Sequence, residues 1–549
     1  MNRLALYWNT VRYLKPSQVL GRIAFRLARP AAEIHPAPPV RPCLRGPVRR
    51  AWRNPSLLGS QHLRFLNETH FIAEPGQWVD KARGDLWLYN AHYFDDLTAV
   101  DAQDRRDWQS SLINQWIEDN PPATGIGWAP YPTSLRIVNW SFWLLDNQDE
   151  QTHARLQSLA VQTRFLNKRI EHHILGNHLL ANAKALVFAG LFFAGAEADA
   201  WYQKGVDLIE RQLKEQILED GGHFELSPMY HNIILNDVLE LLAIHAAFGR
   251  QSPQGWQDLV PGMLKWAEAM THPDGKIGLF NDAAFGIAPT LEQLLTYTRS
   301  LGIKCPHGVP HEPLVHLSAS GYARMARGKA CVITDVAGVG PDYLPAHAHA
   351  DTLSFELSLG TERVIVNGGT SQYGTGPERL RQRGTANHST LMLDETNSSE
   401  VWSGFRVARR ARIISAEVAT SGVDVIVRGE HDGYARLQGR PLHARQWTLT
   451  DTGLTVADEV RGRGTHRIDV LFHLAPDIIA EREDSGIIAL YRHAADAPIA
   501  RVWSAGELKI VRSSWHPSFG TQVASQCLLL SGTHGLPFVN QTTFRWDPS

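Results

Sequence analysis

Two segments of the chain carry residues that can move protons. The segment EHHILGNHLLANAKAL holds Asn177 and His178, and the segment GGHFELSPMYH holds Glu225, Tyr230 and His231. Histidine, tyrosine and glutamate are common general acids and bases, and an amide can stabilise a developing negative charge. Taken alone, Asn177 is as well explained as a helix N-cap, because it opens a strongly apolar helical pattern.

A third segment, PAHAHADTLSFELSLG, has a pattern typical of metal ligands. His347 and His349 alternate on what reads as an incoming strand, so both imidazoles are predicted to face one side. Two histidines are too few for a metal site, so a third ligand would have to come from His388, Asn367 or Asp351. Spacing alone leaves the alternative of a surface pair open.

The elements that position the first two segments are predicted to be helices. From about residue 100 to about 305, apolar side chains recur at helical spacing, and Gly, Pro, Asn and Asp interrupt the pattern between helices. Many antiparallel helices with functional loops between them suggest a bundle, a solenoid or an α/α toroid. The clearest segments are DRRDWQSSLINQWIEDN, TSLRIVNWSFWLLD, HARLQSLAVQTRFLNKRI, GNHLLANAKALVFAGLFFAG and NDVLELLAIHAAFG.

The third segment lies in a part of the chain with a different pattern. After about residue 315, short runs rich in β-branched residues are punctuated by Gly, Asn and Asp about every ten residues. This pattern predicts an antiparallel β-sandwich of one or more layers. We therefore predict a basic arm with a Pro-rich linker at 1–50, a helical domain at 51–312 and a β-domain at 313–549.

The composition fits a large folded protein. The chain has 549 residues, of which 43% are hydrophobic, and a net charge of −2, which argues against disorder, collagen or a coiled coil. Four cysteines without close spacing exclude a disulfide framework and a thiolate zinc finger. The counts of 25 histidines and 17 tryptophans are high. A carbohydrate site would use such rings for stacking on sugars and imidazoles for proton transfer.

The near-neutral total hides a basic N-terminus. Residues 1–50 hold ten Lys and Arg against one acid, Glu33, for a charge of +9. Such an arm contacts nucleic acid, contacts an anionic membrane, or lies on the acidic body of its own chain. No interleaving of aromatic and basic residues on a β-platform accompanies it, so we expect no nucleic-acid partner.

The N-terminal stretch does not read as a targeting segment. It has neither an uninterrupted apolar core nor a small-residue cleavage site, and its apolar residues recur at helical spacing instead. No run of about 18 apolar residues occurs anywhere in the sequence. We therefore expect a cytoplasmic protein without a transmembrane segment.

Six motifs, in order along the chain, resemble the heparinase II/III-like family of polysaccharide lyases. The resemblance covers most of the chain and implies an incomplete α/α toroid followed by a multi-layer antiparallel β-sandwich, a multidomain α + β fold. This agrees with the change of pattern described above. The motifs are YWNTVRYLKPSQVLGRI, WAPYPTSLRIVNW, GNHLLANAKAL, GGHFELSPMYH, HAHADTLSFEL and the stretch from VIVNGGTSQYG to RLRQRGTANHSTLMLDE.

The resemblance implies β-elimination at a uronic acid of an acidic polysaccharide or oligosaccharide. The C5 proton is removed, the 4-linked sugar leaves and an unsaturated product forms. The reaction requires a neutralised carboxylate, a base and an acid. Asn177 matches the residue that neutralises the carboxylate, and Tyr230 matches the acid, which in syn elimination can also be the base. The positions that match catalytic residues are Asn177, His178, Tyr230 and His347.

The resemblance also implies a structural divalent metal, most simply zinc. Family members with a metal hold it through a His, an Asp and a second His, which match His349, Asn367 and His388. Asn367 departs from the pattern, because an amide oxygen replaces a carboxylate and would weaken a zinc site. The alternative is that these three side chains only orient His347 by hydrogen bonds.

Further positions are predicted to contact the polymer. Arginine pairs with carboxylates, and aromatic rings stack on sugars. For the arginines and tryptophans, an internal ion pair or core packing is an equal alternative. The predicted substrate-binding residues are Trp128, Arg136, Glu225, His231, Tyr373, Arg379, Arg383 and Trp402.

Two other functions stay open at this point. A glycoside hydrolase on the same scaffold would use Glu225 with a second carboxylate from Asp220, Asp282 or Asp351. A non-catalytic glycan-binding protein is the other alternative. For the lyase, a cytoplasmic location suggests a role in bacterial exopolysaccharide or capsule metabolism. The family resemblance offers the periplasm as the alternative location.

Overall fold

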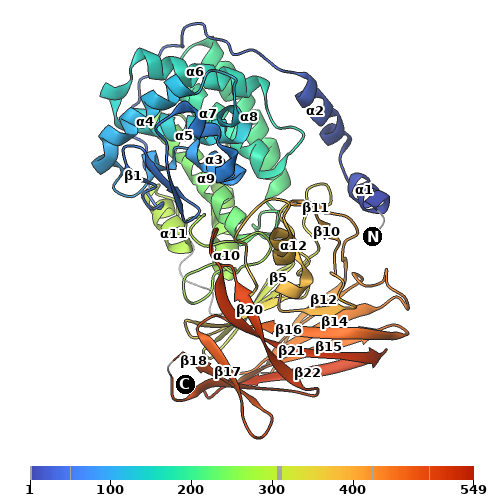
Figure 1. Cartoon of the computed structure of the whole chain (residues 1–549). Helices are drawn as coiled ribbons and strands as arrows, with labels where there is room; N and C mark the ends of the chain where they lie inside the picture. The colour runs from blue at the N-terminus through green and yellow to red at the C-terminus, as the bar shows by residue number, and fades with distance from the viewer. Residues whose placement is uncertain (1–2, 50, 306–311, 423, 494, 549) are drawn as a thin grey trace.

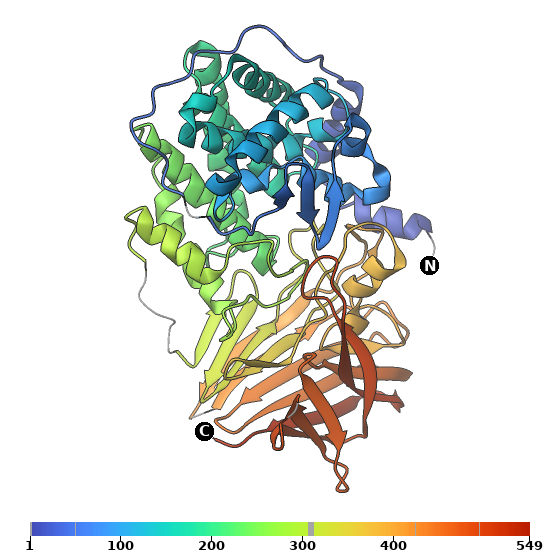
Figure 2. The ribbon, with the colours of Figure 1, turned by 60° about the vertical axis from the view of Figure 1, so that its left-hand side comes forward.

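The computed structural model describes residues 3–49, 51–305, 312–422, 424–493 and 495–548. Its helices gather at one end and its large sheets at the other, as Figures 1 and 2 show from two directions. The change from helix to strand falls between Ser300, where α11 ends, and Leu314, where β4 begins. The predicted boundary at 312/313 lies in this interval.

Helices α3–α11 form an incomplete α/α toroid around an apolar core (Figure 1). The five clearest helices of the sequence pattern are confirmed as α4–α7 and α9. All side chains of α7 except that of His178 are buried, so this helix lies in the middle of the domain. The helices are α3 (Asp85–Ala91), α4 (Arg106–Asp119), α5 (Pro130–Asp146), α6 (His153–Lys168), α7 (Gly176–Phe192), α8 (Ala196–Gln216), α9 (Pro228–Ala247), α10 (Trp256–Ala269) and α11 (Leu291–Ser300).

A small antiparallel sheet, which the sequence pattern did not predict, precedes these helices. Its strands are only three or four residues long, too short for an alternating pattern to stand out. Leu57 and Leu63 turn inward and join the core of the helical domain. The strands are β1 (Leu57–Gly59), β2 (His62–Phe65) and β3 (Glu68–Phe71).

The C-terminal half is a multi-layer antiparallel sandwich, as predicted. Its five-stranded sheet follows chain order, with β4 (Leu314–Leu317), β5 (Tyr322–Arg327), β6 (Ala330–Asp335), β7 (Phe355–Leu359) and β8 (Glu362–Ile365). The four-stranded sheet has the order β20 (Leu508–Trp515), β21 (Val523–Gly535), β16 (Thr465–His473) and β9 (Leu391–Leu393).

The largest sheet has eight strands. Side chains from all three sheets, among them Phe355, Trp447 and Phe472, share one apolar core, which holds the layers together. The short helix α12 (Pro377–Arg383) and the hairpin of β10 (Val401–Trp402) and β11 (Arg406–Val407) lie on the side that faces the helices (Figure 1). The eight strands, in order, are β12 (Ile413–Ser421), β13 (Asp424–His431), β14 (Leu442–Leu449), β15 (Gly453–Arg461), β22 (Phe538–Arg545), β19 (Pro498–Ser504), β18 (Ile488–Arg492) and β17 (Ile478–Arg482).

The two halves meet through packed apolar side chains. Leu226 and Trp266 of the helical half share a cluster with Tyr322 of the sheet half. A second cluster joins Tyr230 to Phe519. Such contacts fix the two halves relative to each other, so that residues from both can form one site.

The N-terminal arm consists of α1 (Arg3–Val11) and α2 (Pro16–Leu27), followed by an extended linker. Figure 1 shows the arm beside both halves and the linker crossing the helical half. Lys15 forms an ion pair with Glu215, and Arg41 pairs with Asp199. Part of the positive charge of the arm is therefore paired with acidic side chains of the body. In the described part of the chain, no helix is long and apolar enough to span a bilayer.

Candidate active site

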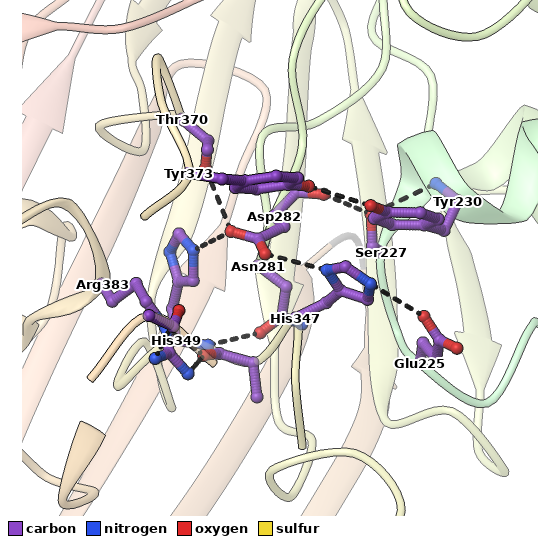
Figure 3. A network of polar contacts seen from close by, with 12 residues as sticks. Glu225, Ser227, Tyr230, Asn281, Asp282, His347, His349, Thr370, Tyr373 and Arg383 are labelled. Atoms are coloured by element: carbon purple, nitrogen blue, oxygen red, sulfur yellow. Dashed lines mark hydrogen bonds and ion pairs between the residues drawn. The ribbon is translucent and has the colours of Figure 1, made fainter. Parts of the chain in front are cut away.

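The predicted catalytic residues come together where the helical and sheet halves meet. Asn177 stands at the start of α7 and Tyr230 at the start of α9, where Ser227 caps the helix by accepting a bond from the Tyr230 backbone amide. His347 comes from the loop 336–354 between β6 and β7. Figure 3 shows Tyr230, Glu225 and His347 side by side.

The prediction that His347 and His349 alternate on a strand is wrong. Both lie in the loop, because the backbone amides next to them bond to a side chain and to the last residue of α12 rather than to a neighbouring strand. The His349 amide donates to Asn281 Oδ1 at 3.0 Å, and the Ala350 amide donates to the Arg383 carbonyl. The two imidazoles nevertheless meet on one partner, Asp282 (Figure 3).

Asn177 does not cap its helix, because the cap position is Leu175. Its side-chain amide donates to both carboxylate oxygens of Glu225, at 3.2 and 3.0 Å, and its backbone amide donates to Oε1 at 3.1 Å. Gly176 permits this contact, since a Cβ there would lie 2.3 Å from Glu225 Oε1. A carboxylate therefore already sits on the donors that the resemblance assigns to a uronate carboxylate.

His347 is held in one tautomer by Asp282. Its Nδ1 lies 2.9 Å from Asp282 Oδ2, and an ionised carboxylate can only accept, so Nδ1 carries the hydrogen. When His347 is neutral, Nε2 therefore carries a lone pair and no hydrogen. Nε2 faces the Asn177 amide at 3.4 Å and Glu225 Oε2 at 3.5 Å. This is the orientation that a general base at this place requires.

Tyr230 packs against this imidazole. The two rings are 3.9 Å apart between centroids, and the Tyr230 hydroxyl lies 2.9 Å from that of Tyr373. Burial, followed by the neighbouring Tyr373, raises the pKa of Tyr230 well above its usual range. Tyr230 therefore keeps its proton at neutral pH and is available as an acid.

His178 lies at the edge of the site. Its ring packs 4.3 Å from Tyr131, and its Nδ1 lies 3.2 Å from Glu171 Oε2. Burial lowers the pKa of His178, but the Glu171 carboxylate outweighs burial, so the net shift is upward. This side chain is 29% exposed, so a bound ligand can reach it. It is placed to add positive charge near the Asn177 end of the site.

Asp282 is the centre of the network, and the sequence analysis gave it only as a possible hydrolase carboxylate. It contacts His347, His349 and both terminal nitrogens of Arg379. Burial opposes its ionisation, but Arg379 and the two histidines hold the pKa of Asp282 well below its usual range. The segment FNDAAFG around it reads as a loop, with no signal for a contact 97 residues away.

Several predicted substrate-binding residues are buried, with their donors engaged inside the protein. Arg383 donates to the carbonyls of Ala348 and Gly404, and burial lowers its pKa to about 9. Arg136 donates to Gln162 and to the backbone of the helical domain. These internal contacts favour a structural role for the two arginines over contact with the polymer. The positions that are at most 4% exposed are Trp128, Arg136, Glu225, His231, Arg379 and Arg383.

Two aromatic residues lie closer to the opening of the site. Tyr373 contacts Tyr230, and its ring lies 5.2 Å from that of Phe405. Phe405 is 41% exposed and 6.2 Å from the His347 ring, so it is placed to stack on a sugar, a role that the sequence analysis missed. Trp402 instead donates from Nε1 to Thr10 of α1 at 3.0 Å.

The predicted metal ligands are neighbours but do not converge. His349 Nδ1 faces His388 Nε2 at 3.3 Å, a spacing that two ligands of one zinc ion would have. Asn367 Oδ1, however, lies 3.3 Å from the other ring nitrogen, Nδ1 of His388. Burial lowers the pKa of His349 to about 4 and that of His388 to about 3, which keeps both neutral.

Comparison with known families gives two adjacent matches. Residues 84–299 match the heparinase II/III N-terminus, and residues 309–547 match the heparinase II/III-like C-terminal family. The chain is 24% identical over 428 residues to a heparin-sulfate lyase of Bacteroides stercoris, covering 72% of this chain and 60% of that protein. Against another heparin-sulfate lyase it covers 48%, so the chain spans about half to three fifths of these relatives.

Two further similarities bear on the fold. The chain is 26% identical over 440 residues to FtsZ-localized protein C of Caulobacter vibrioides, covering 74% of this chain and 72% of that protein. A crystal structure of heparinase III superposes with a TM-score of 0.66 at 18% identity, covering 88% of this chain and 79% of that one. The latter similarity confirms the predicted toroid and sandwich.

Proposed function

Because the chain belongs to the heparinase II/III-like family, we propose that it is a carbon–oxygen lyase that cleaves an acidic polysaccharide by β-elimination at a uronic acid. Three features support this proposal. The family match covers both halves of the chain, relatives carry the name heparin-sulfate lyase, and the site combines an amide, an imidazole nitrogen that carries a lone pair, and a protonated tyrosine.

In the proposed reaction, His347 Nε2 takes the C5 proton of the uronate. The electrons of the broken C–H bond form the C4–C5 double bond, and the C4–O bond to the leaving sugar breaks. Tyr230 donates its hydroxyl proton to the departing oxygen. The tyrosinate that remains can accept a hydrogen bond from Tyr373, whose hydroxyl lies 2.9 Å from that of Tyr230. Asp282 stabilises the imidazolium of His347.

Asn177 and Glu225 together bind the uronate carboxylate in this proposal. The Asn177 amide is the donor, and His178 adds positive charge at the same end. Glu225 occupies the amide before substrate arrives. The hydrogen bond from the Asn177 amide stabilises charge on the substrate carboxylate and so makes the C5 proton more acidic.

The contact between Asp282 and Arg379 is the observation that favours elimination over hydrolysis. A hydrolase needs a second carboxyl group free to act at the sugar. Asp282 is fully buried, and both its oxygens are engaged by Arg379, His347 and His349. It supports the histidines and has no path to a sugar. Asp351, a second candidate, is also buried and accepts a bond from the Asn281 amide.

No step of this proposal uses a metal. His349 and His388 fit two positions of a zinc ion, but Asn367 does not complete the set, because its oxygen contacts the wrong nitrogen of His388. The described residues contain no other group of three or more His, Cys, Asp or Glu placed for a metal. Zinc binding, the cytoplasmic location and a role in exopolysaccharide or capsule metabolism stay predictions.

The proposal is tested by incubating the purified chain with a panel of uronate-containing polymers, including bacterial exopolysaccharides. Elimination produces a conjugated double bond that absorbs in the ultraviolet, together with a new reducing end. We expect both signals to rise in equal molar amounts on at least one polymer. A rise in reducing ends without ultraviolet absorbance would mean hydrolysis, and neither signal on any acidic polymer would reject the lyase.

A further inference from the structure

The two helices of the N-terminal arm each have an inner face that rests on the body. In α2, Gln18 donates to the Tyr343 carbonyl at 3.1 Å, and Phe25 packs against His173 at 4.2 Å. In α1, Tyr7 packs edge-on against Trp402 at 5.0 Å. The arm is therefore a fixed part of the structure and not a free tail.

The outer faces of these helices are apolar and exposed. In α1, Trp8 is 68% exposed, and Val11, one turn further on, is 49% exposed. In α2, Leu20, Ile23 and Leu27 are 66%, 52% and 78% exposed, at spacing i, i+3 and i+7, which places them on one face. Residues 3–27 contain eight of the nineteen exposed large hydrophobic side chains in the described part of the chain.

Basic side chains flank this apolar face, and no acid interrupts it. Arg22 and Arg26 of α2 are exposed and lie beside the apolar row, and Arg12 follows α1. The first acidic residue of the chain is Glu33, beyond the end of α2. The exposed side chains that the arm itself contributes are therefore mainly apolar or positively charged, which matches a surface that is apolar inside and negative outside.

We propose that α1 and α2 bind the surface of an anionic phospholipid bilayer, with their axes in the interfacial plane. Trp8, Leu20 and Leu27 would enter the boundary between headgroups and acyl chains, while the arginines contact lipid phosphates. The charge of the face favours this occupant over a second copy of the chain, because two identical basic faces repel each other. The apolar row excludes purely electrostatic binding.

The proposal has a consequence for the candidate active site. Trp402, which α1 contacts through Tyr7 and Thr10, is two residues from Gly404, whose carbonyl accepts bonds from Arg379 and Arg383. A bilayer on the outer face of the arm would therefore lie on the same side of the molecule as the hairpin of β10 and β11, which holds Trp402 and Gly404. Binding of the arm to a bilayer does not require lyase activity, and vesicle binding is measured without a polysaccharide substrate.

The experiment is co-sedimentation of the full chain with vesicles of phosphatidylcholine, with or without phosphatidylglycerol, at low and high salt. We expect binding to the anionic vesicles that weakens as salt rises. Each basic residue near an anionic surface contributes about fivefold in affinity. The double variant Arg22→Glu with Arg26→Glu should therefore bind about 20-fold more weakly or worse.

A second variant tests the apolar row. Ile23→Ser with Leu27→Ser should also lose binding, at low as well as high salt, because the removed contacts are not electrostatic. Matched controls are Val539→Ser and Arg545→Glu on β22, which are exposed on the sheet half. Both controls should bind as the wild type does. Thermal unfolding of every variant checks that the fold is retained.

Three results would overturn the proposal. The first is equal sedimentation of the wild type and both arm variants, and the second is equal binding to vesicles with and without phosphatidylglycerol. The third is no vesicle binding by the wild type, combined with self-association in analytical ultracentrifugation that the same arm substitutions abolish. The third result would assign the apolar face to another copy of the chain.

Discussion

Two buried clusters in the molecule contain the same residue types. In the first, Asp282 contacts His347, His349 and Arg379. In the second, Asp458 contacts His443 at 2.8 Å and Arg445 at 2.7 Å. Each carboxylate has its pKa lowered by an arginine and by histidines, against the effect of burial.

The difference between the clusters lies in the elements that carry them. His443, Arg445 and Asp458 stand on the neighbouring strands β14 and β15, and Arg445 is directly opposite Asp458 in the register. The nitrogens of His443 are both engaged, one by Asp458 and one by His431. This cluster is complete within the sheet and offers no free group.

The Asp282 cluster joins the two halves of the molecule. Its members come from the segment before α11, from the loop before β7 and from α12, and His347 Nε2 faces Asn177 and Glu225 of the helical half. The same residue types therefore stabilise a sheet in one place and leave a reactive nitrogen in the other. Whether such a cluster is purely structural or presents a reactive nitrogen depends on whether a second domain contributes to it.

The largest expected effect comes from removing the proposed acid. Tyr230→Phe should reduce kcat by about 10²- to 10⁴-fold, because the leaving oxygen no longer receives a proton. The matched control is Tyr434→Phe beside the second cluster, where the hydroxyl donates to the Leu391 carbonyl at 2.7 Å. The control should keep its kcat and lose about 1 kcal/mol of stability. Retained activity in Tyr230→Phe would remove the tyrosine from the mechanism.

The next comparison substitutes the two aspartates in the same way. Asp282→Asn should lower kcat by on the order of 10²-fold or more, because an amide can stabilise the wrong tautomer of His347 and no longer balances the imidazolium. Asp458→Asn should leave kcat unchanged. Both should lower the free energy of unfolding by about 3–5 kcal/mol, since each leaves a buried arginine without its partner. Steady-state kinetics and urea unfolding of both variants measure the two quantities.

An equal loss of kcat in the two aspartate variants would contradict the comparison. It would mean that Asp282 acts only through stability and that the contact with His347 has no catalytic meaning. Conditions that favour the folded state, such as a lower temperature or a bound polymer substrate, would then restore kcat in both variants to the same extent.

These clusters also define what the sequence could predict. The motifs identified Asn177, Tyr230 and His347, and the structure brings them together, because helix starts and loops set where each side chain emerges. They did not predict the role of Asp282, since its partner Arg379 lies 97 residues away and no periodic pattern links the two. Residue type suggested Arg379 and Arg383 as ligands for carboxylates, but their burial depends on tertiary packing.

A smaller effect concerns the carboxylate that sits on Asn177. Glu225→Gln keeps a polar side chain that can contact both the Asn177 amide and the substrate carboxylate, and we expect a loss of less than about tenfold in kcat. Glu225→Ala removes these contacts and should cost about 10- to 100-fold. Steady-state kinetics with the active polymer compares the two. Equal losses would show that the carboxyl group itself is required.

The smallest expected effect is a pH dependence of stability in the sheet cluster. Burial opposes ionisation of Asp458, but Arg445 and His443 lower its pKa to about 2. A lowered pKa in the folded state stabilises the fold above the usual aspartate pKa, and this stabilisation is lost as the pH falls through about 4 towards about 2. It amounts to about 2 kcal/mol.

Urea unfolding between about pH 5 and about pH 3 measures this contribution. The wild type should lose stability as the pH falls, partly through Asp458 and partly through Asp282, whose pKa is also lowered. Asp458→Asn, although less stable throughout, should show a shallower pH dependence than the wild type because one titrating carboxylate is gone. If the free energy of unfolding of this variant changed with pH as steeply as that of the wild type, the neighbours of Asp458 would not lower its pKa. The two clusters would then resemble each other in residue type alone.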